Sequence, residues 1–151
     1  MDTSSLKAVA AEIRKDILTM VHLAGDGHPG PALSIADIMT ALYFGIMRVD
    51  PQKPDWEERD RLILSKGHAC PVLYAALAKK GYFSPDALPT LRRFGSILQG
   101  HPDMNKTPGV DMTSGSLGNG LAIGAGMAMA ARYLGRDYYT YVITGDGELE
   151  E

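Results

Sequence analysis

The sequence predicts an α/β fold in which a parallel sheet is flanked by helices. Residues 138–144 are aromatic or β-branched and carry no charge, a composition typical of a strand buried on both faces of a parallel sheet. Residues 62–64 are short and wholly apolar, which indicates a second buried strand. Helical patterns alternate with these strands, and this order is typical of α/β layers.

Two strands are too few for a complete sheet. A typical sheet has about four to six strands, and the second predicted strand lies close to the last residue. We therefore expect the sheet to be incomplete in this chain, either because the chain stops partway through its own domain or because partner chains complete it.

Two helices are predicted before the first strand. Apolar residues at three- and four-residue steps predict an amphipathic helix over residues 5–23, ended by the glycines that follow. Ser34 and Asp37 form a pattern like a capping box, which predicts a second helix from Ser34 to about Met47.

The middle of the chain continues with helices and one long loop. The pattern is helical again over residues 71–80. Ser84 and Pro85 read as a cap and a first-turn proline, which predicts a short helix over residues 86–93. Residues 94–112 are rich in Gly, Pro, Asp and Asn and show no periodicity. A loop of this length in a compact domain is usually functional or disordered.

The segment 114–134 is a run of Ala, Met, Leu and Ile that reads as helical and is interrupted by glycines. These glycines are Gly115, Gly118, Gly120, Gly124 and Gly126. Each glycine inside a helix costs about 0.8 to 1 kcal/mol relative to alanine. We expect close packing to offset this cost, since small residues let another backbone or a cofactor approach.

Composition excludes several classes of protein. The 151 residues suit one domain, and a net charge of -3 without a basic run gives no sign of nucleic-acid binding. Cys70 is the only cysteine, so a disulfide within the chain is impossible and a reducing, cytoplasmic compartment is expected. Its apolar context favours a core residue over a nucleophile. No apolar stretch approaches the ~20 residues that span a bilayer, so no membrane partner is expected.

An aspartate follows the last predicted strand, between Gly145 and Gly147. Open α/β sheets bind ligands at the carboxyl ends of their strands, and glycine lets a bulky anion approach the backbone. The carboxylate of Asp146 is a hard oxygen ligand, suited to Mg²⁺ or Ca²⁺ that bridges it to a diphosphate. Asp-Gly is also a common turn dipeptide, so these residues alone leave both interpretations open.

Three of the four histidines follow a glycine: His28, His68 and His101. Two lie in Gly-His-Pro loops and the third follows a predicted strand, so all three are expected to gather at one edge of the sheet. Imidazole, with a pKa of about 6.5, exchanges protons near neutral pH. One alternative is a zinc site, although the spacing matches no zinc motif. The other is three unrelated loop histidines.

Five motifs stand in the order and approximate spacing of one enzyme family. They are GHPG at 27–30, SKGHA at 65–69, GHPD at 100–103, SGSLGNG at 114–120 and GDGELEE at 145–151. On these motifs the chain resembles transketolases and, more narrowly, the N-terminal subunit of split transketolases. The resemblance implies a thiamine-diphosphate-binding fold, with residues 1–151 forming the N-terminal part of the diphosphate-binding domain. Thiamine diphosphate and Mg²⁺ (or Ca²⁺) are the implied cofactors.

The resemblance also implies roles for single residues. Asp146 matches the metal ligand. The residues assigned to the cofactor are His68, Gly115, Ser116, Leu117, Gly145, Asp146, Gly147 and Glu148. Those assigned to catalysis are His28, His68 and His101, which match histidines near substrate or diphosphate, and Glu151, which matches a glutamate linking two cofactor sites across a dimer.

The implied reaction transfers a two-carbon ketol unit from a ketose phosphate to an aldose phosphate. The family's second metal ligand, an asparagine farther downstream, is absent from this sequence, and so is the pyrimidine-binding domain. We therefore expect a C-terminal partner subunit, a homodimer or heterotetramer, and no turnover by this chain alone. Two alternatives stay open: a synthase of the deoxyxylulose-phosphate-forming type, or a non-catalytic fragment that docks through its Gly/Ala helix.

Overall fold

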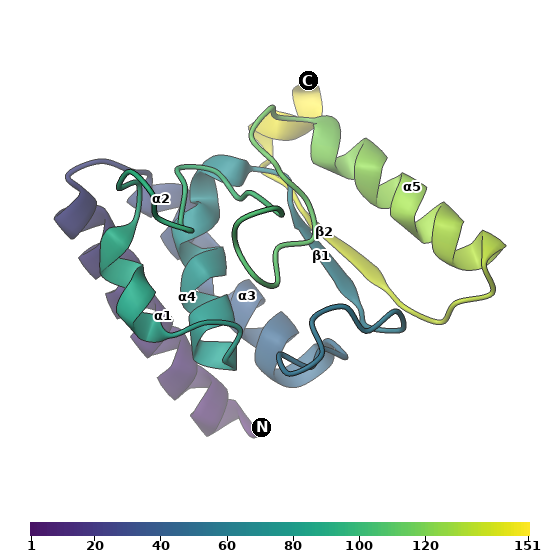
Figure 1. Ribbon diagram of the computed structural model, residues 1–151, viewed down its shortest axis with the longest axis horizontal. Helices are drawn as coiled ribbons and strands as arrows, with labels where there is room; N and C mark the ends of the chain where they lie inside the picture. Colours follow the sequence, from purple (N-terminus) through teal and green to yellow (C-terminus); the bar gives the residue numbers. More distant parts are fainter.

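The computed structural model describes residues 1–151. Helices form a layer on one side of a two-stranded sheet, and a single helix covers the other side (Figure 1). In chain order the elements are α1 (Thr3–Ala24), α2 (Pro29–Ser34), α3 (Ala36–Ala41), a π-helix (Leu42–Ile46), β1 (Arg61–Leu64), a 3-10 helix (Gly67–Ala69), α4 (Cys70–Lys80), a 3-10 helix (Pro85–Thr90), α5 (Asn119–Tyr133), β2 (Thr140–Ile143) and a 3-10 helix (Gly147–Glu150).

The two strands are parallel, as predicted, with Leu64 opposite Ile143. Successive side chains of β1 point to opposite faces of the sheet. Leu62 and Leu64 belong to the core among the helices, whereas Ile63 points to α5, where it lies near Gly124. The prediction that the last strand is buried on both faces is wrong for this chain. All four residues of β2 are half-buried, because β1 is its only hydrogen-bonded neighbour.

The core is organised around α4. Every residue from Cys70 to Ala78 is buried, and α1, α2 and α3 all contact this helix. A helix that is apolar on all sides is typical of a central position. The expectation that Cys70 is a core residue is confirmed, and burial raises the pKa of its thiol to about 12.

The first helix is confirmed, and the second is confirmed as α3 followed by the π-helix, residues 36–46, but its predicted cap at Ser34 is wrong. Asp2 caps α1 by accepting a hydrogen bond from the amide of Ser5 at 2.8 Å. Ser34 does not begin a helix but ends α2, where its hydroxyl donates to the carbonyl of Pro31 at 2.9 Å. The carboxylate of Asp37 pairs with Arg14 of α1 at 2.6 Å instead of completing a cap. The short helix α2 therefore precedes the predicted one, and Pro29 begins α2 because the first helical position needs no amide donor.

The short helix predicted after Ser84 is shorter than expected. The hydroxyl of Ser84 does accept a hydrogen bond from the amide of Asp86, so the cap is confirmed. The segment is a 3-10 helix that ends at Thr90 and contains Pro89, which has no amide to donate. Arg92 then has a positive φ of 64°, and this turns the chain away.

The long loop 94–112 contains no regular helix or strand and covers an edge of the sheet. Near its end the carboxylate of Asp111 accepts a hydrogen bond from the amide of Leu62 at 2.7 Å and pairs with Arg59. The loop therefore satisfies a backbone donor at the open edge of β1, which is one way in which proteins protect exposed strand edges.

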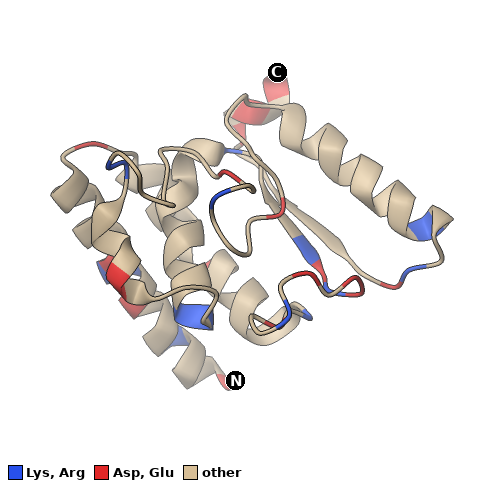
Figure 2. Ribbon diagram, viewed as in Figure 1, with Lys and Arg blue, Asp and Glu red and all other residues tan.

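The Gly/Ala helix α5 begins only at Asn119, so Gly115 and Gly118 lie in the turn before it. A Cβ atom added at Gly120 would collide with Ser65, and one added at Gly124 would collide with Val142. Close packing is thus confirmed for these two glycines, whereas Gly126 faces open space. The outer face of α5 is exposed and almost free of charge (Figure 2).

None of the helices is both long enough and apolar enough to cross a membrane.

Candidate functional site

The carboxyl ends of β1 and β2 lie side by side, and each leads into a 3-10 helix (Figure 1). Because the strands are parallel, the segments after Leu64 and after Ile143 reach the same edge of the sheet. A cavity of about 420 Å³ opens there. It is lined by Gly30, Pro31, Ser34, Lys66, His68, Leu117, Gly145, Asp146, Gly147 and Glu148.

Asp146 lies exposed in the turn at the tip of β2. It occupies the N-cap position of the last 3-10 helix, but its side chain does not cap that helix. Next to it, no atom lies within 4 Å of where a Cβ of Gly147 would be. The turn therefore presents a carboxylate that the fold does not use, beside backbone that a large ligand can approach.

Glu148 is buried directly behind this turn and is only 5 % exposed. One carboxylate oxygen accepts hydrogen bonds from the hydroxyl of Ser65 and from the amide of Gly118 at 3.0 Å. The other accepts from the amide of Gly145 at 2.9 Å. Burial alone would raise the pKa of Glu148, but these hydrogen bonds outweigh it and lower the pKa below its usual value. The side chain is therefore an anion that joins three loops.

Lys66 is the charged residue of the site that the sequence-based prediction missed, and Gly30, Pro31 and Ser34 also line the cavity without having been predicted as site residues. Lys66 follows β1 within the SKGHA motif, is 7 % exposed and lines the cavity. Burial lowers the pKa of its ammonium group, whereas the nearby carboxylates of Glu148 and Asp146 raise it. Its place directly after a buried strand was the signal that could have identified it.

The three histidines gather near this edge, as predicted. The rings of His28 and His68 meet edge to face with 5.2 Å between their centroids, and the His101 ring lies beside Gly115. Burial lowers the pKa of His68, and the positive charges of His28, Lys66 and His101 lower it further. Of the three, only His68 lines the cavity.

No group of three or more His, Cys, Asp or Glu side chains is arranged to hold a metal ion. Any cation at the strand tips would thus need ligands beyond these side chains, such as oxygen atoms of a bound anion.

The other predicted site residues lie around the cavity or line it in part. Leu117 lines it, whereas Gly115, Ser116 and Glu151 do not. Glu151 lies against the backbone of Gly118 and lines a smaller neighbouring cavity of about 130 Å³. The two cavities are therefore neighbours: Leu117 lines the larger, Gly118 lines the smaller, and Glu148 lines both.

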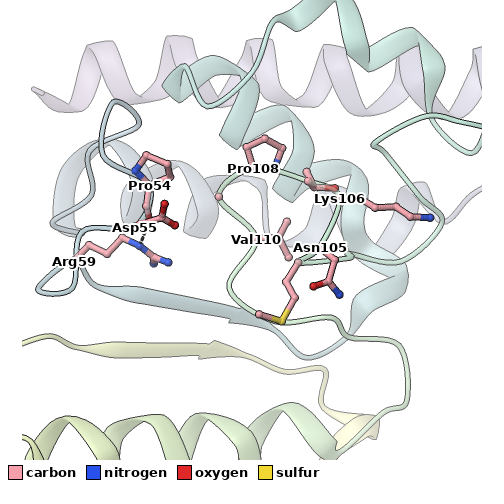
Figure 3. A pocket seen from close by; sticks show the side chains of 10 residues that line it. Pro54, Asp55, Arg59, Asn105, Lys106, Pro108 and Val110 are labelled. Carbon is pink, nitrogen blue, oxygen red and sulfur yellow. Dashed lines mark hydrogen bonds between the residues drawn. The ribbon is translucent and has the colours of Figure 1, made fainter.

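A third cavity, of about 290 Å³, shares no residue with the first and lies between residues 54–59 and 104–110 (Figure 3). Both basic side chains that line this cavity already interact with other groups of the protein. Arg59 donates to the carbonyl of Pro54 and pairs with Asp111, and Lys106 pairs with Asp103 at 3.9 Å. No histidine or cysteine lines it. The candidate functional site is therefore the cavity at the carboxyl ends of the strands.

Comparison with known proteins gives consistent results. Residues 5–151 match the family model described as "Transketolase, thiamine diphosphate binding domain". The chain is 50% identical over 146 residues to the 6-deoxy-6-sulfo-D-fructose transketolase subunit SqwG of Clostridium sp. (strain MSTE9), covering 97% of this chain and 53% of that protein. It is 46% identical over 151 residues to an apulose-4-phosphate transketolase subunit of Phocaeicola vulgatus, covering 100% of this chain and 53% of that protein.

Solved structures agree with the sequence relatives. Transketolase from Leishmania mexicana superimposes with a TM-score of 0.94 at 38% identity, covering 100% of this chain and 24% of that one. The chain spans about half the length of the two curated relatives named above.

Proposed function

Because the chain belongs to the transketolase family, we propose that it supplies the diphosphate-binding half of a thiamine diphosphate-dependent transketolase active site. The reaction would transfer a two-carbon ketol unit from a ketose phosphate to an aldose phosphate. The observation that carries the proposal is the unused carboxylate of Asp146 beside the glycine-lined cavity at the strand tips.

The residues at this cavity fit such a cofactor. Neither Gly30 nor Gly147 has any atom within 4 Å of a would-be Cβ, so both leave room for a bulky group. Mg²⁺ is usually held by one or two carboxylates together with phosphate oxygens, and Asp146 offers one carboxylate. Ca²⁺ accepts the same oxygen ligands. When bound, thiamine diphosphate supplies the carbanion chemistry, and the protein orients the reactants and stabilises charge.

The chain's own residues would have distinct tasks. Glu148 holds the Asp146 turn against the end of β1, and its carboxylate contacts protein donors. Burial lowers the pKa of His68 and so favours the neutral imidazole, a form that can donate one hydrogen bond and accept another. We assign His28 and His101 to the substrate side of the same edge.

The remaining assignments concern the turn before α5 and the last residue. Leu117 would provide apolar surface for the thiamine rings, with Gly115 and Ser116 shaping the turn beside it. Glu151 would connect this site to the matching site of a second protomer.

The rest of the active site would come from a partner. The curated relatives that are named as subunits are nearly twice as long as this chain. We propose a C-terminal transketolase subunit that carries the pyrimidine-binding domain, in a homodimer or heterotetramer that acts on sugar phosphates in the cytoplasm.

The test uses the complete protein assembled with its C-terminal partner. Thiamine diphosphate is titrated calorimetrically at several Mg²⁺ concentrations, for the unaltered protein and for the Asp146→Ala variant. We expect the affinity for thiamine diphosphate to fall by at least about tenfold. Removing a residue that only hydrogen-bonds to a metal ligand already costs about this much, and Asp146 would be a ligand itself.

Glu150→Ala is the control, because Glu150 is an exposed carboxylate in the same 3-10 helix. It should leave the affinity unchanged. Equal Mg²⁺-dependent affinities for the Asp146→Ala variant and the unaltered protein would reject the metal role. An assembly that shows no ketol transfer when cofactor and sugar phosphates are supplied would reject the activity.

A further inference from the structure

Lys66 is a buried residue, yet its ammonium group forms no ion pair. Three charged residues of the chain are buried: Asp60, Lys66 and Glu148. Both acids accept several hydrogen bonds; Asp60, for example, accepts from the amide of Tyr139 at 2.9 Å and pairs with Arg48. Lys66 forms no ion pair, and its contacts are the carbonyl of Pro31 at 3.4 Å and the hydroxyl of Ser34 at 3.5 Å, both neutral.

These contacts are poor compensation for a buried cation. Hydrogen bonds from nitrogen to oxygen are normally 2.7–3.2 Å long, so both contacts of Lys66 are weak. Removing an ammonium group from water is costly unless it is paired and hydrogen-bonded. The fold meets this requirement for its two buried acids but not for Lys66.

The location of Lys66 indicates which kind of ligand would pair with its ammonium group. Its alkyl chain lies 3.8 Å from where a Cβ of Gly145 would be, and the residue lines the same cavity as Asp146 and Gly147. Apart from His68, it is the only basic side chain that lines this cavity. The cavity therefore combines an exposed carboxylate on one turn with a buried lysine that forms no ion pair.

We propose that Lys66 binds the diphosphate of the cofactor directly, as the second anchor beside the metal held by Asp146. This inference rests on the proposed function. A divalent cation neutralises only part of the charge of a diphosphate, and an ammonium group is a compact point charge that phosphate oxygens accept well. The two anchors differ in kind: Asp146 acts through the metal ion, whereas Lys66 donates its own hydrogen bonds.

The test compares Lys66→Met, which keeps the length but removes the charge, with the unaltered protein in its complete assembly. Hydrogen bonds to charged groups contribute about 1.5–3 kcal/mol, so the dissociation constant of thiamine diphosphate should rise by about 10- to 100-fold at saturating Mg²⁺. Inorganic pyrophosphate, tested as a competitor, should lose affinity in parallel. Lys106→Met, at an exposed lysine, should change neither value.

A second measurement separates ligand binding from a structural role. Without cofactor, the thermal midpoint of the Lys66→Met variant should equal or exceed that of the unaltered protein, because an uncompensated buried charge has been removed. If Lys66 served only to hold Pro31 and Ser34, the midpoint would fall instead.

The outcomes also separate this proposal from the proposed function. If the Lys66→Met variant binds thiamine diphosphate as tightly as the unaltered protein, or if its cofactor-free form is less stable, the role of Lys66 is overturned while the cofactor site stands. If the unaltered assembly does not bind thiamine diphosphate at all, the proposed function fails, and the role of Lys66 fails with it.

Discussion

The carboxylate of Glu148 accepts a hydrogen bond from the hydroxyl of Ser65, which lies 83 residues earlier in the chain. Both side chains are buried, and the bond joins the segment after β2 to the segment after β1. Because Glu148 also accepts from Gly118 and Gly145, one side chain fixes three loops relative to each other. The position of the Asp146 turn therefore depends on this carboxylate.

Replacing Glu148 by Gln should destabilise the protein although the shape is kept. The amide has only one acceptor oxygen, so its NH₂ group must face a donor that the carboxylate now satisfies. Leaving a buried donor without an acceptor costs about 1–3 kcal/mol. We expect the free energy of unfolding of the cofactor-free protein, measured with urea, to fall by that amount. Glu150→Gln, at an exposed site, is the matched control, and equal stability of both variants would contradict the role of Glu148.

Two glycines of α5 should respond in opposite directions to the same substitution. Gly124→Ala places a methyl group against Val142 and should cost about 1–3 kcal/mol by overpacking. Gly126→Ala meets no atom within 4 Å and should stabilise the helix by up to about 1 kcal/mol. Thermal midpoints of the two variants test this. If both variants shift in the same direction, the contact between α5 and the sheet is not the one described.

Stability should fall as the pH drops below about 6.5, the usual pKa of histidine, in part because of His68. Burial and nearby positive charges lower the pKa of His68 in the folded state, so the unfolded chain binds more protons at this position. The contribution of His68 to the free energy of unfolding is therefore fully present above the pKa that this residue has in the unfolded chain. It is lost as the pH falls toward the lower pKa that the residue has in the folded protein.

Urea unfolding from about pH 8 to about pH 5 measures this dependence. His68→Gln, which cannot be protonated, should show a shallower decrease than the unaltered protein. His22→Gln is the control, because His22 is exposed near the end of α1. Parallel curves for the His68 variant and the unaltered protein would show that this imidazole does not contribute.

Local patterns predicted the elements whose signals are local. The apolar stripe of α1 and the short apolar run of β1 were identified correctly, since both depend on the period of side chains along one segment. The prediction at Ser34 failed because a serine hydroxyl can bond backward to a carbonyl as well as cap a helix forward. The burial of β2 depends on neighbouring strands, which no local pattern reports.

Part of the candidate site could be predicted from the sequence. The cavity is lined by His68, Leu117, Gly145, Asp146 and Gly147, all of which the motifs predict. Sequence could not show that the carboxylate of Glu148 contacts protein donors, because two of its three donors, Ser65 and Gly118, come from distant segments. Nor could it show that Lys66 forms no ion pair, since pairing is a property of the folded chain.

The sequence by itself determined the family, the parallel strands and the motif residues, because these depend on residue type and order along the chain. Only the tertiary structure decided which of those residues meet, which carboxylate stays free and which cation is left without a partner. The physical reason is that a charge acquires its role from its surroundings. Asp146 and Glu148 are near neighbours with the same functional group, yet folding exposes one and surrounds the other with donors.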